Sequence, residues 1–195
     1  MRVSWISMPG SFAVPPFRSC NFLVAFFPPL RYYATWRLLV AASRMNRIER
    51  RTLIRAPRSR VWQAITDIRQ FCQWFSTESA EPAFRPGAHI RLISTHPGPY
   101  YKMEFFVDIV EMVAEHTFSW RWHPASVLTG EDLSQEPMTL VVFRLEDAEG
   151  GTLVTVAESG FDQLFPSRIT QVFGANEAGW KHQMAALERF FSDAK

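Results

Sequence analysis

After Met45, the apolar residues follow the spacing of strands and helices in a clear order. Residues 47–56 are rich in β-prone side chains. Pro57 follows them and suits the first turn of a helix. Apolar residues then recur with helical spacing over 61–68 and again over 68–75. This part of the pattern predicts one strand followed by two short helices.

Alternation of apolar and polar residues dominates the middle of the chain. It marks five segments, separated by connections rich in Gly, Pro or charged residues, at 88–95, 101–113, 117–122, 139–146 and 152–159. Connections of hairpin length favour an antiparallel sheet. From 166 to 193 the apolar residues recur at steps of three and four, which predicts one long amphipathic helix. We therefore expect an α+β fold in which a curved antiparallel sheet packs one face on the C-terminal helix.

Residues 1–44 differ from the rest of the chain in charge. They contain five arginines and no lysine or acidic residue, whereas residues 45–195 contain sixteen basic and nineteen acidic residues and carry a net charge of −3. Repeated prolines interrupt this N-terminal segment. We interpret 1–44 as a disordered extension or a misassigned start, and 45–195 as the domain. An organelle transit peptide and a short helix over 32–43 are open alternatives.

Composition excludes several classes of protein. Hydrophobic residues make up 47% of the chain and charged residues 21%, which is typical of a globular domain. The longest apolar run falls short of the roughly 18 residues that a membrane-spanning helix needs. A net charge of +2 gives no indication of nucleic-acid binding. Cys20 and Cys72 form no CxxC pair, so neither a disulfide framework nor a cysteine zinc site is expected. The apolar run of the N-terminal segment has no cleavage site after it, and we expect a cytoplasmic location.

Several short motifs resemble one known superfamily. The string Ala-Pro-Arg-Ser-Arg-Val-Trp-Gln-Ala-Ile-Thr-Asp occupies 56–67, and the supporting pieces follow in the expected order: Trp74-Phe75, Arg85-Pro86-Gly87, Phe118-Ser119-Trp120, Glu158-Ser159-Gly160-Phe161 and Gly179-Trp180. Over about 46–193 the chain resembles the SRPBCC (START-like) superfamily, and more closely its branch named after the activator of heat-shock protein 90 ATPase. Ala88 stands where that family often has a second glycine. The resemblance implies a helix-grip fold with a hydrophobic cavity, and it implies no particular reaction.

The alternating strands and the C-terminal helix carry many aromatic residues that share a face. Such residues would line a cavity between sheet and helix, with few polar groups among them. The opposing interpretation is a core filled by its own side chains. The cavity candidates are Trp74, Met103, Phe105, Val107, Phe118, Trp120, Trp122, Phe143, Trp180 and Met184, with Glu158 as the polar member.

Glu158 has the most informative polar position. It follows Val154 and Val156 at even spacing, so its side chain is expected on their face of the strand. There it would be desolvated, and it would orient a ligand or act as a general base. The alternative, which we favour from sequence, places the carboxyl in water at the end of the strand beside Gly160. The same caution applies to Glu111.

Catalytic and cofactor motifs are missing. The five histidines show no HxxxH spacing, and the sequence contains no GxSxG, GxGxxG or Walker pattern. We expect no metal and no cofactor. The polar segment 126–138 is interpreted either as a flap over the cavity entrance or as a plain surface loop.

These observations predict a non-catalytic domain that binds an apolar or aromatic small molecule. One alternative is a protein-interaction domain that docks on a chaperone, as the resemblance implies. A second is an enzyme of cyclase or hydrolase type, which needs two convergent polar groups in the cavity. The expected partner is a small apolar ligand, with a chaperone as the alternative and no nucleic acid, and the chain is expected to be a monomer or a homodimer.

Overall fold

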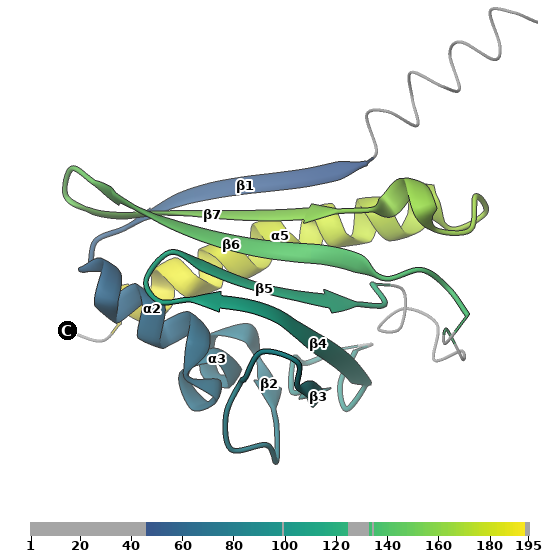
Figure 1. Cartoon of the computed structure of the whole chain (residues 1–195), viewed down its shortest axis with the longest axis horizontal. Coiled ribbons are helices and arrows are strands. Elements are labelled where there is room, and N and C mark those ends of the chain that lie inside the picture. The colour runs from purple at the N-terminus through teal and green to yellow at the C-terminus, as the bar shows by residue number, and fades with distance from the viewer. Residues whose placement is uncertain (1–45, 99, 125–132, 134, 194–195) are drawn as a thin grey trace, which may run out of the picture.

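The structure is a computed structural model that describes residues 46–98, 100–124, 133 and 135–193 (Figure 1). The helix expected at 32–43 and most of the flap expected at 126–138 lie outside these residues. The described elements, in chain order, are β1 (Arg47–Ile54), α2 (Arg58–Thr66), α3 (Ile68–Phe75), β2 (Thr77–Glu78), β3 (His89–Ser94), β4 (Glu104–Val113), β5 (Thr117–Trp122), β6 (Thr139–Ala148), β7 (Gly151–Ser159), the 3₁₀ turn η1 (Phe161–Gln163) and α5 (Ile169–Ser192).

All seven strands form one antiparallel sheet in the order β1-β7-β6-β5-β4-β3-β2. Figure 1 shows this sheet curving across α5, with α2 and α3 closing one end. Helix α5 packs against β1 and α3. The helix-grip architecture expected from the sequence is confirmed. Among the described residues, no helix is both long enough and apolar enough to cross a membrane.

The two short helices begin and end at residues that suit helix termini. Pro57 precedes α2, and the Asp67 side chain caps α3 by accepting a hydrogen bond from the backbone N–H of Gln70 at 3.0 Å. Helix α3 ends at Ser76, which adopts a left-handed conformation with φ 56°. The indole N–H of Trp74 donates to the carbonyl of Ala64 at 2.9 Å and fixes α3 against α2.

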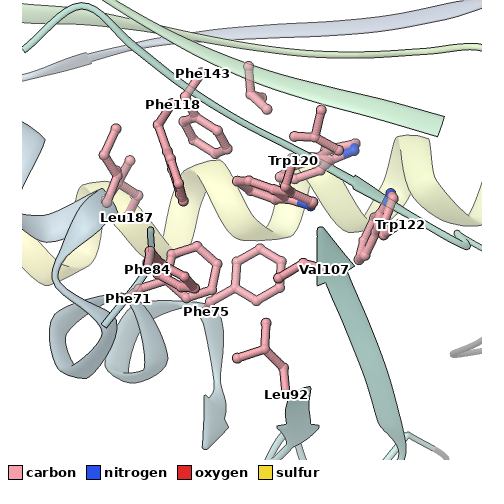
Figure 2. Close-up of a cluster of buried hydrophobic side chains, with 14 of the residues drawn as sticks. Phe71, Phe75, Phe84, Leu92, Val107, Phe118, Trp120, Trp122, Phe143 and Leu187 are labelled. Carbon is pink, nitrogen blue, oxygen red and sulfur yellow. The ribbon is translucent and has the colours of Figure 1, made fainter. Parts of the chain in front are cut away.

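Aromatic side chains fill the space between the sheet, α3 and α5. Figure 2 shows Phe71 and Phe75 of α3 facing Trp120 and Phe143 of the sheet, with α5 behind them. The rings of Trp120 and Phe143 stack at 5.6 Å, and Phe71 meets Trp120 edge-on at 5.9 Å. Trp120, Phe143 and Phe118 are each at most 2% exposed. Much of the apolar face predicted from the alternation is therefore packed core rather than open cavity.

The sequence pattern placed most elements within a few residues. Strand β4 begins at Glu104 rather than near 101, so Met103 precedes it, and its register with β5 shifts between Ile109 and Glu111. Helix α5 begins at Ile169 rather than near 166, because residues 164–168, which follow η1, form bends and turns instead of helix. The short strand β2 and the turn η1 carry too few residues for a recognisable period.

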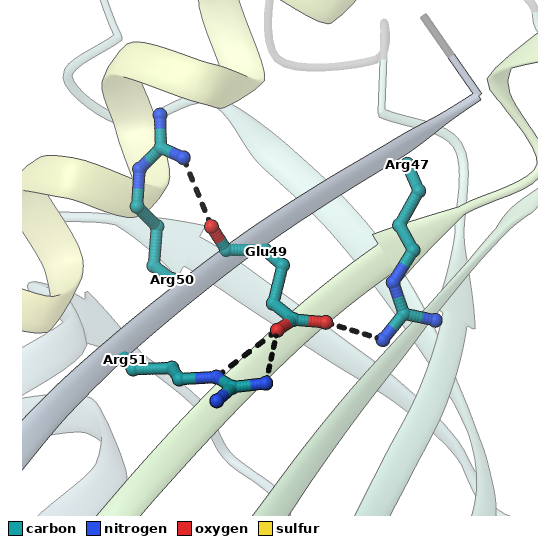
Figure 3. Close-up of polar contacts among 4 residues, drawn as sticks. All are labelled: Arg47, Glu49, Arg50 and Arg51. Atoms are coloured by element: carbon teal, nitrogen blue, oxygen red, sulfur yellow. Dashed lines mark hydrogen bonds and ion pairs between the residues drawn. The ribbon is translucent and has the colours of Figure 1, made fainter. Parts of the chain in front are cut away.

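Charged side chains cover the outer face of β1, the edge strand next to β7. The Glu49 carboxylate accepts hydrogen bonds from Arg47 at 2.7 Å and from Arg51 at 2.7 and 3.0 Å (Figure 3). Arg50 donates to the Glu49 carbonyl at 2.9 Å and pairs with Glu177 of α5 at 2.8 Å. Charges of this kind discourage pairing of the edge with another chain.

Candidate functional site

An open cavity of about 420 Å³ lies beside the packed core. Its walls come from the end of α3, strands β2 to β5, the connection between β3 and β4, and one face of α5. A volume of this size is within the range of about 300–1,000 Å³ found for small-molecule sites. The cavity lies between part of the sheet and α5, and the predicted binding of a ligand there stays a prediction.

Aromatic residues from four elements form the apolar wall of the cavity. Phe75 ends α3, Phe105 belongs to β4, Trp122 ends β5 and Trp180 belongs to α5. The rings of Trp122 and Trp180 lie 6.1 Å apart, and Phe105 meets Trp122 edge-on at 5.8 Å. These rings offer flat, rigid contact area of the kind that binds apolar or aromatic ligands.

Small residues of α5 leave space for the cavity. Ala175, Ala178 and Gly179 line it, and a Cβ atom built on Gly179 meets no heavy atom within 4 Å. A larger residue at position 179 would therefore enter open space rather than collide with the fold.

Polar groups gather on the side formed by the connection between β3 and β4. His96 and Tyr100 from this connection and His182 from α5 all line the cavity. The two imidazole rings lie 5.2 Å apart, edge to face. His96 Nδ1 donates to the Pro97 carbonyl at 2.8 Å, so its Nε2 is the ring nitrogen left for other partners. Among the described lining residues there is no Asp, Glu, Lys or Arg.

Glu158 organises the cavity wall from behind. Its Oε1 accepts hydrogen bonds from the Trp122 indole at 2.8 Å, the Thr139 hydroxyl at 2.6 Å and the Asn176 amide at 3.0 Å. Its Oε2 accepts from the Trp180 indole at 2.6 Å and from the Asn176 amide at 2.9 Å. Trp122, Asn176 and Trp180 all line the cavity, while Glu158 does not. One carboxyl group thus fixes three wall residues from β5 and α5.

Burial decides the protonation chemistry of Glu158. The side chain is 0% exposed, and desolvation raises the pKa of its carboxyl above the ordinary value, although the four neutral donors oppose that shift. The Thr139 hydroxyl can accept as well as donate, so the short contact with it suits both protonation states. The position in water that we favoured from the sequence is wrong, because α5 covers this end of β7 with Asn176 and Trp180. Glu111, by contrast, is exposed.

The structure divides the predicted cavity residues into two groups. Phe105, Trp122 and Trp180 line the open cavity. The others do not line it: Met103 is half-buried before β4, and the buried ones are Trp74, Val107, Phe118, Trp120, Phe143, Glu158 and Met184.

Sequence reasoning missed the polar part of the lining. His96 and His182 were considered only as metal ligands, and Tyr100 and Gln183 carried no recognisable motif. One usable signal was Asn176, a polar residue in the apolar stripe of α5, because such a residue needs a buried polar partner. That partner is Glu158.

The lining chemistry favours binding. Among the described residues, no three His, Cys, Asp or Glu side chains gather as a metal site would require. The free thiol of Cys72 lies outside the cavity lining, and burial raises its pKa, which disfavours the reactive thiolate. The cavity therefore offers aromatic surface with a few polar groups at one side.

Several solved structures share this fold. A protein from Mesorhizobium loti is 17% identical, with a TM-score of 0.59 over 76% of this chain and 98% of that one. The Aha1 dimer from Colwellia psychrerythraea is 17% identical, with a TM-score of 0.56 over 73% and 92%. DynU16, described as a putative protein in the dynemicin biosynthetic locus, is 22% identical, with a TM-score of 0.56 over 77% and 48%. At these identities the similarity establishes the fold alone.

Sequence comparison gives a more specific assignment. No curated protein sequence matches the chain significantly. The family model described as "Activator of Hsp90 ATPase homolog 1-like protein" matches residues 55–192, which is most of the chain and nearly all of the described domain. The chain therefore belongs to the family of Activator of Hsp90 ATPase homolog 1-like proteins, within the SRPBCC superfamily.

Proposed function

We propose that this domain binds an apolar or aromatic small molecule in the cavity between α5 and the β3–β5 part of the sheet. The observation that carries the proposal is the open volume of about 420 Å³ beside an otherwise close-packed aromatic core. The cavity opens to solvent where Tyr100, Gly179 and His182 are exposed, as an entry path for a ligand requires. Glu158 fixes part of its wall through Trp122, Asn176 and Trp180.

The proposed role is binding and release without chemical change of the ligand. An enzyme of cyclase or hydrolase type would need polar groups converging on one reacting atom. Glu158 stands behind the wall with its oxygens occupied by five hydrogen bonds. We therefore assign it a structural role, holding the wall. The proposal keeps the cytoplasmic location and the monomeric or homodimeric state expected from the sequence.

The test is a titration with N-phenyl-1-naphthylamine, a neutral apolar probe whose fluorescence rises on leaving water. Wild-type protein is expected to bind it at one saturable site. Gly179 lines the cavity at its exposed rim, so in Gly179→Leu the added side chain is expected to restrict the cavity and to lower the affinity by about tenfold or more, a loss of about 1.4 kcal/mol or more of binding free energy.

The matched control is Gly174→Leu. Gly174 lies on the same helix and, like Gly179, is exposed and meets nothing within 4 Å of a built Cβ, but it does not line the cavity. Both substitutions replace a helical glycine with a better helix former, so neither is expected to unfold α5. Probe binding that is unchanged in Gly179→Leu, or that is absent from the wild type, would contradict the proposal.

Family membership favours a second candidate, an interaction with a chaperone. This candidate predicts a complex of the full chain with heat-shock protein 90 and a change in the rate of ATP hydrolysis by that chaperone. Analytical ultracentrifugation of the two purified proteins tests it. A complex that forms equally with Gly179→Leu would separate the docking surface from the cavity.

A further inference from the structure

We infer that the cavity is selective for amphipathic ligands whose aromatic body ends in an acidic group, a carboxylate or a phenolate, with His96 and His182 receiving that group. This inference rests on the proposed function, because it specifies the ligand class of the same cavity. It stands on the division of the lining into an aromatic side and an imidazole side.

The geometry of the two histidines supports a shared anion. They come from opposite walls, His96 from the connection after β3 and His182 from α5, and their rings approach to 5.2 Å. The Pro97 carbonyl occupies His96 Nδ1, which directs further hydrogen bonding to Nε2. When His96 is protonated, Nε2 becomes a second donor with a positive charge. The rings are in edge-to-face contact, so an acidic group would bind beside the pair, from the cavity, and would receive charge-assisted hydrogen bonds from both imidazoles when they are protonated.

The titratable groups around the cavity are consistent with binding of an acidic group at the histidines. Among the described lining residues, the titratable ones are His96 and Tyr100 from the β3–β4 connection and His182 from α5, and α3, β2, β4 and β5 contribute none. None of the described lining residues carries a carboxyl group that would repel an anion. The carboxyl group hydrogen-bonded to the wall is that of Glu158, which is enclosed by neutral donors. The two imidazoles are therefore the described lining groups that can carry a positive charge.

The experiment compares 2-naphthoate with its neutral isostere 2-naphthamide by isothermal titration calorimetry on the full chain at pH 6. EDTA is present because two neighbouring imidazoles can also bind contaminating metal ions. Wild-type protein is expected to bind naphthoate about tenfold more tightly than naphthamide.

The variants separate charge recognition from general binding. His96→Asn and His182→Asn are expected to weaken naphthoate binding at pH 6 by about fivefold to tenfold and to change naphthamide binding by less than about twofold. The double variant is expected to lose the preference for naphthoate over naphthamide. His116→Asn is the control, because His116 is exposed in the turn between β4 and β5 and does not line the cavity.

The outcomes distinguish a failure of the inferred ligand class from a failure of the proposed binding function. Equal binding of naphthoate and naphthamide by the wild type, or an equal loss of both in the histidine variants, would overturn the inference and leave the proposed function standing. A failure of both compounds and of the neutral probe N-phenyl-1-naphthylamine would overturn the proposed function and the inference together. Circular dichroism of each variant establishes that the fold is intact.

Discussion

Glu49 and Glu158 stand on the adjacent strands β1 and β7, and their surroundings differ in almost every respect. Glu49 lies on the outer face among arginines, and hydrogen bonds from Arg47 and Arg51 lower the pKa of its carboxyl (Figure 3). Glu158 lies on the inner face, with no cation among its hydrogen-bond partners, and desolvation raises its pKa. One glutamate has favourable charges and abundant water, and the other has neither.

The comparison shows that the carboxyl group with ion pairs need not be the one that contributes most to stability. Solvent screens the ion pairs of Glu49, so they contribute little to stability despite their short distances. The hydrogen bonds of Glu158 are made to neutral groups, but they join β5, β6 and α5 at the wall of the cavity. Removing the buried carboxyl leaves buried donors without partners, which costs more than removing the exposed pair.

The largest effect is expected from Glu158→Leu. Leucine fills a similar volume but accepts no hydrogen bond, so the buried indole N–H groups of Trp122 and Trp180 and the half-buried Asn176 amide lose their partner. We expect the free energy of unfolding to fall by about 3–5 kcal/mol, because more than one donor loses its acceptor, measured by urea denaturation. Glu111→Leu, a matched change at an exposed site, is expected to leave the denaturation midpoint nearly unchanged. Similar midpoints for the two variants would show that the Glu158 network is dispensable.

A smaller loss is expected from Glu158→Gln. The amide retains one acceptor oxygen, but its NH₂ group must face either the Trp122 or the Trp180 indole, and an indole N–H only donates. One tryptophan therefore loses its partner, and the unfolding free energy at pH 5 is expected to fall by about 1–3 kcal/mol. Thermal unfolding followed by circular dichroism measures it. A melting temperature equal to that of the wild type would mean that the network tolerates an amide.

The pH dependence of stability sharpens the same comparison. Because burial raises the pKa of Glu158 in the folded state, its contribution is fully present below the unfolded-state value of 4.5 and is lost as pH rises through the folded-state value. The stability advantage of the wild type over Glu158→Gln is therefore expected to shrink as pH increases. Urea titrations of both proteins between pH 4 and pH 8 test this. An advantage that grows with pH would contradict a raised pKa for Glu158 in the folded state.

The smallest effect is expected from Glu49→Gln. The substitution removes the ion pairs with Arg47 and Arg51 but leaves every group in contact with water. We expect no measurable change in melting temperature at physiological salt and a slight decrease at low salt, where screening is weaker. Differential scanning calorimetry at two salt concentrations measures both. A decrease as large as that of Glu158→Gln would invalidate the contrast between the two carboxyl groups.

The sequence predicted the architecture well because its signals are local. Alternation along β6 and β7 and the apolar stripe of α5 depend only on spacing within one element. Family-typical motifs then predicted how the elements assemble, and residues 55–192 match the family model. Elements of two or three residues, β2 and η1, have no period to detect.

The site was predicted less completely because it depends on how far elements separate in space. Trp120 and Trp122 share a face of β5, yet Trp120 is packed by Phe71 and Phe143 while Trp122 borders open volume. Alternation gives the direction of a side chain but not the distance to the opposing element. The burial of Glu158 likewise depends on the position of α5, and the sequence of β7 gives no information about that position.

The most direct test of the account is the response of individual tryptophan indoles to ligand, observed by ¹H–¹⁵N NMR of the full chain. Titration with N-phenyl-1-naphthylamine is expected to shift the indole signals of Trp122 and Trp180, which line the cavity and donate to Glu158. The indole signal of Trp62, on α2 and away from the cavity lining, is expected to stay in place. A titration that shifts Trp62 and leaves Trp122 and Trp180 unmoved, or that shifts no indole signal, would contradict binding in this cavity.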